Sequence, residues 1–233
     1  GMILGANGIK MGKRFPEFVV NPTDIVKSHG ADALRMYEMF MGPLEADKPW
    51  NSNGLDASRK FLDRIYRLFT DNKVIAKENP NLEKVYHQTV KKITEDYENL
   101  SFNTAIAQMM IFINEVYKQD YLPLEYAEGF IKLLNPLCPH FTEELWNMLG
   151  HKKTIAYEKW PEYDIEKTLD NKYEMVVQVN GKVRGKMEMS NNDAEDKMKE
   201  YAMKIPNVKV FTDGKEIVKV IVVPKKLVNI VVK

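Results

Sequence analysis

The sequence predicts a mainly α-helical, multi-domain protein in which an antiparallel α-helical bundle precedes a small C-terminal α+β domain. From residue 55 to about residue 150, apolar residues recur at the spacing of amphipathic helices. After residue 172, the pattern changes to the alternation of half-buried strands. Charge changes with it: residues 171–233 hold 13 Lys and Arg against 8 Asp and Glu, a net +5, and residues 1–170 hold 21 against 25, a net −4.

The composition, with 44% hydrophobic and 29% charged residues in a chain of 233, is that of a globular protein able to bury more than one core. The only cysteine, Cys138, excludes an internal disulfide, and the four histidines show no metal-ligand spacing, so we expect no intrinsic metal site. No apolar run approaches the ~20 residues of a membrane-spanning helix, and the N-terminus lacks the features of a secretory signal. We therefore expect a cytoplasmic protein without membrane contacts.

Turn signals dominate the first 54 residues. Asn7 and Gly8 tolerate the positive φ angles of a tight hairpin turn. Asn21 is placed as an N-cap before a helix, and Gly30 is placed to end that helix. The expected elements are a strand at 2–4, a return leg with an exposed loop at 9–14, and helices at 22–30 and 32–41.

Helical periodicity defines the bundle. The expected apolar stripes lie at 61–69, 82–97 and 102–117, and shorter helical segments follow at 124–134 and 141–149. Four or five antiparallel helices with short connections are therefore expected.

The C-terminal region combines a hairpin with further strands. Residues 174–179 alternate, pass through Asn180 and Gly181, and continue into 182–189, which is typical of a β-hairpin by period and by turn chemistry. A single helix is expected to end near Lys204. Strands are expected at 208–211, 216–223 and 227–232, where β-branched residues are dense. The predicted domain boundaries are 1–54, a bundle at 55–160, a linker at 161–171 and a C-terminal domain at 172–233.

The strand that leaves this hairpin turn carries Lys182, Arg184 and Lys186. Alternation predicts that the three side chains share one face, about 7 Å apart, which is near the phosphate repeat of a nucleic-acid chain. Composition alone favours the simpler interpretation, an ordinary charged outer face of a half-buried sheet. Lys225 and Lys226 are further candidates for phosphate contact by the same reasoning.

A second basic segment lies near the N-terminus, where Lys10, Lys13 and Arg14 place three cations within five residues of a glycine-containing loop. Such a loop can fold over a triphosphate and stabilise the charge that develops on a pyrophosphate leaving group. Taken without context, a basic surface turn is the better interpretation. The sequence contains no G-x-G-x-x-G after a strand, no G-x-x-x-x-G-K-[ST] loop and no complete catalytic constellation at a diagnostic spacing.

The order of motifs supplies that context. Residues 10–14, 19–22 and 30–35 resemble the K-M-S-K-S signature and the following G-A-D-x-L-R segment of class I aminoacyl-tRNA synthetases. Residues 37–45 and 48–50 are similar to leucyl-tRNA synthetases rather than to their valyl, isoleucyl or methionyl relatives. The loop departs from the family pattern, because Gly12 and Arg14 stand where the family has serines.

The resemblance continues to the end of the chain. Residues 135–146 are similar to the P-H-x-x-E-E-L-W helix of the family's anticodon-binding-type bundle. Residues 177–184 and 220–230 resemble its bacterial-type C-terminal domain, which docks on the tRNA elbow. The resemblance thus covers the whole chain, with its motifs in the order of the family.

The resemblance implies a function for both basic segments. In the complete enzyme, leucine–tRNA ligase, Lys13 would contact the phosphates of ATP with Lys10 in support, as the catalytic residues of this loop. The implied contacts to ATP are Lys10, Met11, Gly12, Lys13 and Arg14, and those to tRNA-Leu are Lys182, Arg184, Lys186, Lys225 and Lys226. ATP with Mg²⁺ is implied for the full enzyme only, and no cofactor is intrinsic to this chain.

The family carries its main ATP motif, its Rossmann fold and its editing domain upstream of the point where this chain begins. The chain is therefore expected to be inactive alone and to need these N-terminal domains, on the same chain or as a separate subunit. One alternative is the smaller subunit of a split synthetase. Another is a non-catalytic RNA-binding or partner-binding module derived from a synthetase.

Other prominent residues have structural interpretations. Arg59, Arg64 and Arg67 lie along one expected helix, where contact with a tRNA stem and a solvated helix flank explain them equally well. Asp32 and Arg35 have the spacing of an i,i+3 ion pair within a helix.

Overall fold

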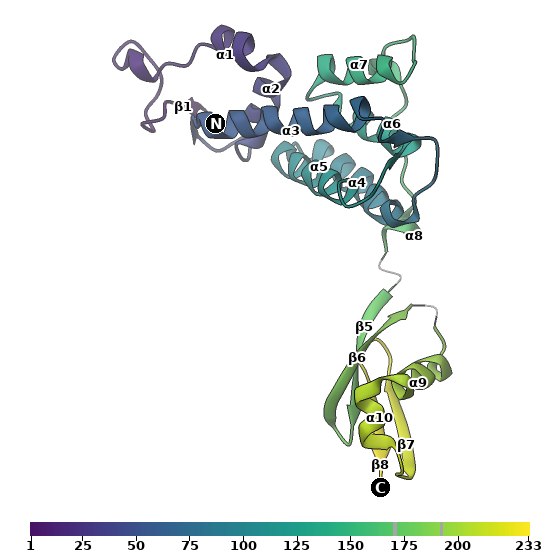
Figure 1. Ribbon diagram of the computed structural model, residues 1–233. Helices are drawn as coiled ribbons and strands as arrows, with labels where there is room; N and C mark the ends of the chain where they lie inside the picture. The colour runs from purple at the N-terminus through teal and green to yellow at the C-terminus, as the bar shows by residue number, and fades with distance from the viewer. Residues whose placement is uncertain (170–171, 192) are drawn as a thin grey trace. The chain divides into compact units, whose positions relative to one another are not determined.

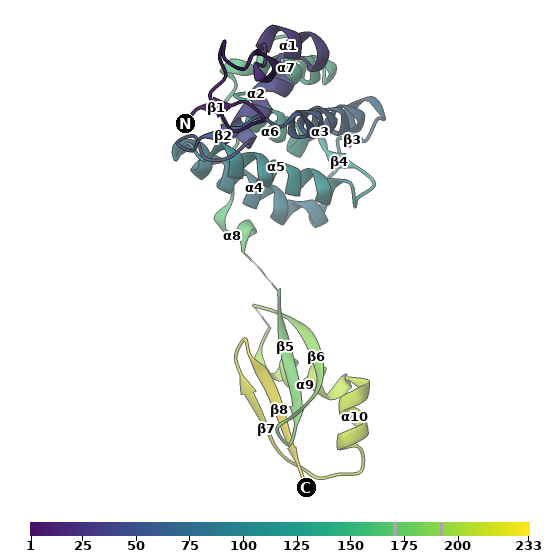
Figure 2. The same cartoon turned by 90° about the vertical axis from the view of Figure 1, so that its left-hand side faces the viewer.

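The computed structural model describes residues 1–169, 172–191 and 193–233, which form two units, Gly1–Thr168 (unit 1) and Leu169–Lys233 (unit 2). Figures 1 and 2 show a helical unit 1 and, in unit 2, a small sheet with two helices. Each unit contains its own hydrophobic core. The predicted fold class, a mainly helical protein with a small C-terminal α+β domain, is confirmed.

Three helices of unit 1, α1, α3 and α4, begin where asparagine supplies a cap. The side chains of Asn21, Asn51 and Asn79 each accept a hydrogen bond from the backbone N–H two residues on, at 3.0–3.2 Å. The predicted cap at Asn21 is therefore confirmed. The helices of unit 1 are α1 (Pro22–His29), α2 (Ala31–Phe40), α3 (Ser52–Thr70), α4 (Pro80–Glu98), α5 (Phe102–Val116), α6 (Leu124–Leu134), α7 (Pro139–Met148) and α8 (Ile165–Thr168), with short 3-10 turns η1 (Pro16–Phe18) and η2 (Ile155–Tyr157).

The main core lies between α2, α3, α4, α5, α6 and α7. The apolar stripes predicted from the sequence face this core, as the complete burial of Ile65, Ile93 and Met109 illustrates. Helices α4 and α5 pack side by side in both views (Figures 1 and 2), connected by a short turn in which Leu100 has a positive φ of 55°. Short connections and a shared apolar face give the antiparallel arrangement expected for a bundle.

The first residues form less sheet than the sequence predicts. Strand β1 (Ile3–Leu4) pairs in parallel with β2 (Lys48–Pro49), and the expected return leg contributes a single antiparallel bridge between Leu4 and Lys10. A second two-stranded pair, β3 (Val74–Ile75) with β4 (Leu122–Pro123), ties the end of α3 to the start of α6. The long-range parallel pairing has no local signal, whereas the turn residues Asn7 and Gly8 do, which is why the sequence suggested a hairpin here.

The segment predicted as a linker is in part attached to unit 1. Gln88 Nε2 of α4 donates to the carbonyl of Thr168 at 2.8 Å, and Lys167 pairs with Glu83 at 2.7 Å. The N–H of Asp164 donates to His87 Nδ1 at 3.1 Å, and burial of that imidazole lowers the pKa of His87. The last two residues of the predicted linker, 170 and 171, lie outside the described residues.

Unit 2 is a four-stranded sheet with the order β6-β5-β8-β7, in which the central pair β5–β8 is parallel and the outer pairs are antiparallel. Its elements are β5 (Lys172–Val179), β6 (Lys182–Ser190), α9 (Glu195–Lys204), α10 (Pro206–Thr212), β7 (Ile217–Val223) and β8 (Leu227–Val232). The predicted turn is confirmed, with φ of 47° at Asn180 and 77° at Gly181. Asn180 also exchanges two hydrogen bonds with the backbone of Val232, at 3.0 and 3.1 Å.

One strand prediction is wrong, because residues 208–211 lie within helix α10. Pro206 occupies the first turn of this helix, where its missing N–H costs nothing. Val208 and Thr212 are buried one turn apart and face the sheet. Two helices, rather than the expected one, thus cover the core face of the sheet, and the burial of one helix side outweighs the β-propensity of the valines.

Candidate nucleic-acid interface

The basic segment at 10–14 forms an exposed loop of unit 1. The side chains of Lys10 and Lys13 make no hydrogen bond or ion pair with any described residue. The Arg14 guanidinium lies 5.4 Å from the centroid of the Phe15 ring. The loop therefore presents cations whose charge is not neutralised by the rest of the chain.

One residue anchors this loop. Met11 is half-buried against a small core that contains Tyr37 and Trp50, and its sulfur accepts a hydrogen bond from the N–H of Val20 at 3.4 Å. Gly12, next to this anchor, is exposed, and a Cβ added there would meet no atom within 4 Å. Met11 thus anchors the loop, and the charged groups of Lys10, Lys13 and Arg14 lie in solvent.

Behind the loop, α2 is joined to α7 by a buried carboxylate. Asp32, 6% exposed, accepts hydrogen bonds from the N–H of Phe141 at 2.6 Å and from His140 Nδ1 at 3.0 Å. It therefore caps the first turn of α7 from another helix. Because a carboxylate only accepts, His140 carries a proton on Nδ1 in this contact.

Arg35 strengthens the same joint. Its Nε and Nη2 donate to the carbonyls of Leu137 and Pro136, each at 2.9 Å. The predicted i,i+3 ion pair between Asp32 and Arg35 is therefore wrong, because both side chains satisfy backbone groups more than one hundred residues away. Burial raises the pKa of the nearby Cys138 thiol, so this cysteine is a packing residue and not a nucleophile.

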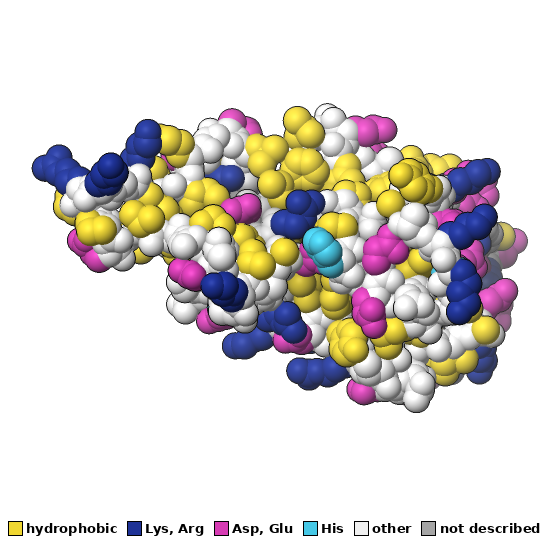
Figure 3. Space-filling view, turned by 90° about the horizontal axis from the view of Figure 1, so that it is seen from above, with side chains coloured by type: hydrophobic (Ala, Val, Ile, Leu, Met, Phe, Trp, Pro, Cys, Tyr) yellow, Lys and Arg dark blue, Asp and Glu magenta, His cyan; other side chains and the backbone are white. Residues whose placement is uncertain are grey.

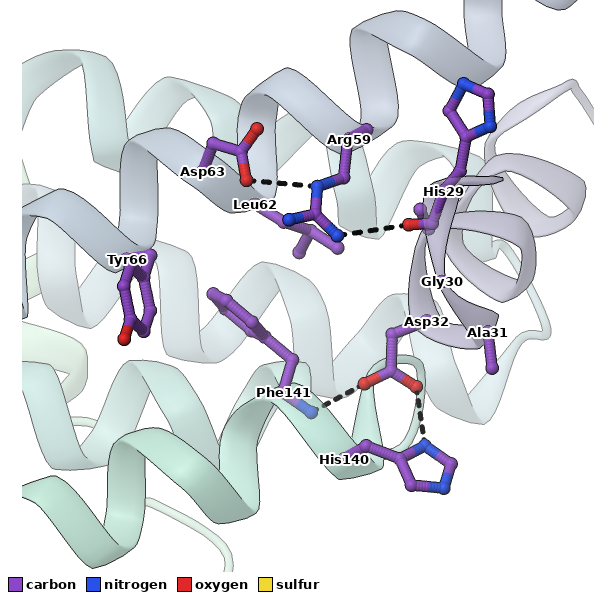
Figure 4. Close-up of a pocket in the computed structure, with 11 residues that line it drawn as sticks. His29, Gly30, Ala31, Asp32, Arg59, Leu62, Asp63, Tyr66, His140 and Phe141 are labelled. Atoms are coloured by element: carbon purple, nitrogen blue, oxygen red, sulfur yellow. Dashed lines mark hydrogen bonds and ion pairs between the residues drawn. The ribbon is translucent and has the colours of Figure 1, made fainter. Parts of the chain in front are cut away.

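A groove of about 410 Å³ opens beside this joint, between the α1–α2 junction, α3 and the start of α7. Figure 4 shows Tyr66 and Arg59 projecting from α3, and Phe141 pointing from α7 towards α3. Arg59 Nε pairs with Asp63 at 3.0 Å, and its Nη1 donates to the carbonyl of His29 at 3.1 Å. Figure 3 shows one face of the molecule, on which hydrophobic, acidic and basic side chains are interspersed around an exposed histidine.

The other two arginines of α3 differ in their surroundings. Arg64 Nη2 donates to Asn114 at 3.0 Å, and its guanidinium lies 4.8 Å from the centroid of the Tyr117 ring. Arg67 is exposed, and its side chain makes no hydrogen bond or ion pair with a described residue. Arg64 is therefore a structural cation between α3 and α5, whereas Arg67 is free to meet an anion.

The three cations predicted on one face of β6 do not share a face. Partners across an antiparallel pair lie on the same side of a sheet, and Lys182 pairs with Val179, whose side chain is buried under the helices. Lys186 pairs with Val176, which lies on the opposite, helix-free face. A bulge between Val177 and Gln178 of the partner strand shifts the register, so simple alternation fails.

Arg184 is the extra residue at this bulge. Its guanidinium carbon lies 3.6 Å from the centroid of the Phe211 ring of α10, which is direct stacking. Its Nε is buried and has no hydrogen-bond partner among the described residues. Arg184 therefore packs on the helix-covered side, and less of its charge is available to a nucleic acid than the sequence suggests.

The remaining basic candidates cluster at one row of the sheet. Lys225 and Lys226 are exposed in the turn between β7 and β8, immediately before Leu227. Leu227 pairs with Val176, which in turn pairs with Lys186. Lys186 of β6, Val176 of β5 and Leu227 of β8 are therefore paired across the sheet, so Lys186 lies level with the end of the β7–β8 turn. Lys182 lies further along β6, next to the β5–β6 turn.

Comparisons with known proteins agree with this architecture. The family model of the anticodon-binding domain of tRNA ligase matches residues 80–199, more than half of the chain. The chain belongs to this family. It is also similar over 100% of its length to agnB2 LeuRS of Agrobacterium radiobacter K84, solved in a ternary complex with tRNA and LeuAMS, at 28% identity and a TM-score of 0.73. The chain spans 33% of the length of that LeuRS chain.

Membership in the anticodon-binding domain family and the similarity to a LeuRS confirm the resemblance that the motifs predicted. Among the described residues, no helix is long and apolar enough to cross a membrane. The roles of the individual site residues stay predictions. Sequence reasoning named Arg59 and Asp32 singly but missed the groove beside Tyr66, because its lining comes from three segments that are distant in the sequence, residues 29–33, 59–66 and 140–141.

Proposed function

We propose that this chain is the C-terminal, tRNA-binding part of a leucine–tRNA ligase, which attaches leucine to tRNA-Leu at the expense of ATP. The observation that carries the proposal is the similarity, along the whole chain, to a LeuRS solved with tRNA. Unit 1 supplies the phosphate-facing loop and a helical surface for tRNA, and unit 2 supplies a further RNA contact. N-terminal catalytic and editing domains, on the same chain or on a separate subunit, complete the enzyme, which acts in the cytoplasm.

The loop at 10–14 suits the phosphates of ATP. The free ammonium groups of Lys10 and Lys13 stabilise the charge that develops on the pyrophosphate leaving group as leucyl-adenylate forms. Arg14 adds a planar donor, Met11 anchors the loop, and the absence of a side chain at Gly12 lets the loop backbone approach the nucleotide. The cationic loop offers no ligand for Mg²⁺, so we propose that this ion arrives bound to the triphosphate.

Salt dependence tests the RNA contact in unit 2. We expect the purified chain to bind a fluorescently labelled tRNA-Leu transcript with an affinity that falls steeply as salt rises, because binding releases counterions. The double variant Lys182→Gln with Lys186→Gln is expected to weaken binding and to lower the slope of log K against log salt by about 2. A matched double variant on α9, Lys199→Gln with Lys204→Gln, carries the same charge change and is expected to keep most of the slope.

Activity measurements separate the ligase from the alternative roles. The chain alone is expected to show no leucine-dependent exchange of pyrophosphate into ATP. Addition of the N-terminal catalytic part is expected to restore exchange, and Lys13→Ala is expected to remove most of it with tRNA affinity unchanged. If the chain binds tRNA-Leu but does not support exchange with the N-terminal part, it is a non-catalytic RNA-binding module. If the chain does not bind tRNA at low salt, both roles are contradicted.

A further inference from the structure

The groove of unit 1 is lined by aromatic rings on one side and by aliphatic side chains at its base, which suits a flat ligand. Its volume of about 410 Å³ lies within the range of small-molecule sites, roughly 300–1,000 Å³. Leu62 and Ala33, both buried, form its floor. Tyr66 and Phe141 form one side, with ring centroids 6.5 Å apart and ring planes inclined by 48°. Tyr66 is 40% exposed, so a face of its ring remains accessible.

Some polar groups around the groove are already hydrogen-bonded within the chain, and others are not. Both oxygens of Asp32 already accept hydrogen bonds, and one oxygen of Asp63 is held by Arg59. Four groups have no hydrogen-bond partner among the described residues: three that can donate, namely Nη2 of Arg59, the hydroxyl of Tyr66 and Nε2 of His140, and one acceptor, the second oxygen of Asp63. The unused capacity is therefore mainly that of donors, which suits phosphate and hydroxyl oxygens and does not suit a metal cation.

Arg59 is held in position before any ligand arrives. Its Nε bond to Asp63 and its Nη1 bond to the carbonyl of His29 fix the plane of the guanidinium at the mouth of the groove. Figure 4 shows this group facing the space between Phe141 and the α1–α2 junction. A fixed guanidinium beside an exposed aromatic ring is the combination with which proteins hold an unstacked base and its phosphate.

We propose that this groove binds one unpaired nucleotide of the RNA that the chain holds. The base lies against the rings of Tyr66 and Phe141, and Nη2 of Arg59 contacts a phosphate oxygen of the same nucleotide. His140, anchored through Nδ1 to Asp32, presents Nε2 to the sugar or to the base edge. The inference rests on the proposed function in one respect, that the source of the nucleotide is a bound tRNA.

Nuclear magnetic resonance titration of the 233-residue chain tests the groove directly. The probes are AMP, UMP and inorganic phosphate, added separately, and the readout is the set of backbone amide shifts. The nucleotides are expected to shift amides at 29–33, 59–66 and 140–141, and inorganic phosphate is expected to bind more weakly at the same place. Equal binding of phosphate and nucleotides, or no shift in these ranges up to the solubility limit, would overturn the proposal.

Matched variants assign the contacts. Tyr66→Leu keeps an apolar side chain and removes the ring, and it is expected to weaken nucleotide binding about fivefold or more. Arg59→Gln is expected to do the same, whereas Lys60→Gln removes an exposed charge from the same helix outside the groove and is expected to have no effect. Tyr157→Leu, which changes a tyrosine that is 91% exposed, is the control for loss of a ring. If Tyr66→Leu behaves like Tyr157→Leu while both stay folded by circular dichroism, base stacking in the groove is wrong.

Binding of labelled tRNA-Leu by the same variants separates the two proposals. A loss of affinity in Tyr66→Leu and Arg59→Gln, but not in the controls, supports a nucleotide of the tRNA as the occupant. Wild-type tRNA affinity in all four variants would overturn the groove proposal and leave the proposed function standing. Failure of the unaltered chain to bind tRNA would contradict the proposed function, and the mononucleotide titration would still show whether the groove accepts a nucleotide.

Discussion

The loop of unit 1 and the strand β6 of unit 2 carry similar sets of cations in opposite structural settings. In the loop, Lys10 and Lys13 extend from the fold without partners among the described residues. In β6, Arg184 is stacked on an aromatic ring and Lys186 pairs with Glu174 at 2.8 Å. The density of basic residues is therefore a poor guide to available charge, and the engagement of each side chain with the fold is a better one.

This comparison orders the expected effects of substitution on stability. Residues of the hairpin are part of the packing of unit 2, so changes there act on its folding. Residues of the loop touch little, so changes there act on ligands alone. We therefore expect the loss of stability on substitution to decrease from the hairpin of unit 2 to the loop of unit 1.

The largest effect is expected for Asn180→Ala. The substitution removes both hydrogen bonds to the backbone of Val232. It also places alanine at a φ of 47°, a conformation that asparagine tolerates better because its polar side chain bonds locally. We expect the free energy of unfolding of unit 2 to fall by about 2–3 kcal/mol. Urea unfolding followed by amide resonances of unit 2 measures this loss.

Asn180→Gly separates the two causes. Glycine accepts the positive φ without strain but lacks the amide, so its cost reports on the two hydrogen bonds. A glycine variant as stable as the unaltered chain would show that the ties to β8 contribute little and that the hairpin is held by its turn alone.

Arg184→Ala is expected to have an intermediate effect. It removes the stack on Phe211 and exposes part of that ring, at a cost of about 1–2 kcal/mol to unit 2. Arg184→Lys is expected to recover little, because an ammonium cannot stack as a plane. Thermal unfolding compares these variants with Lys186→Ala, whose exposed ion pair is worth less than about 0.5 kcal/mol. Equal losses in Arg184→Ala and Lys186→Ala would contradict the distinction between packed and exposed cations.

Local chemistry predicted much of the fold. The spacing of apolar residues located the long helices, the cap at Asn21 located the start of α1, and Asn180 with Gly181 located the hairpin. These signals are available because each depends on residues within one or two turns of one another. The helix at Pro206–Thr212 was missed because Val208, Val210 and Phe211 have β-propensity and the segment is too short to show which of its sides will be buried.

The candidate site was less accessible from sequence because its contacts are long-range. The cap that Asp32 places on α7 joins residues 109 apart, and nothing local distinguishes it from an ion pair with Arg35. The bulge in β6 likewise depends on the register with β5, and it places Lys186 on the opposite face from Lys182 and Arg184. The basic loop was found, because its residues are adjacent and its chemistry is carried by exposed charge.

The smallest effect is expected for Gly12→Ser, which restores a hydroxyl that the family carries at this position. Gly12 has no positive φ, and a Cβ there meets no atom within 4 Å, so we expect stability to change by less than about 0.5 kcal/mol. Gly30→Ser is the matched control, because Gly30 has a φ of 89° between α1 and α2, where a side chain is strained. Differential scanning calorimetry of unit 1 compares the two. A loss in Gly12→Ser as large as that in Gly30→Ser would mean that the loop is held by the fold as firmly as β6, and the contrast between the two basic segments would fail.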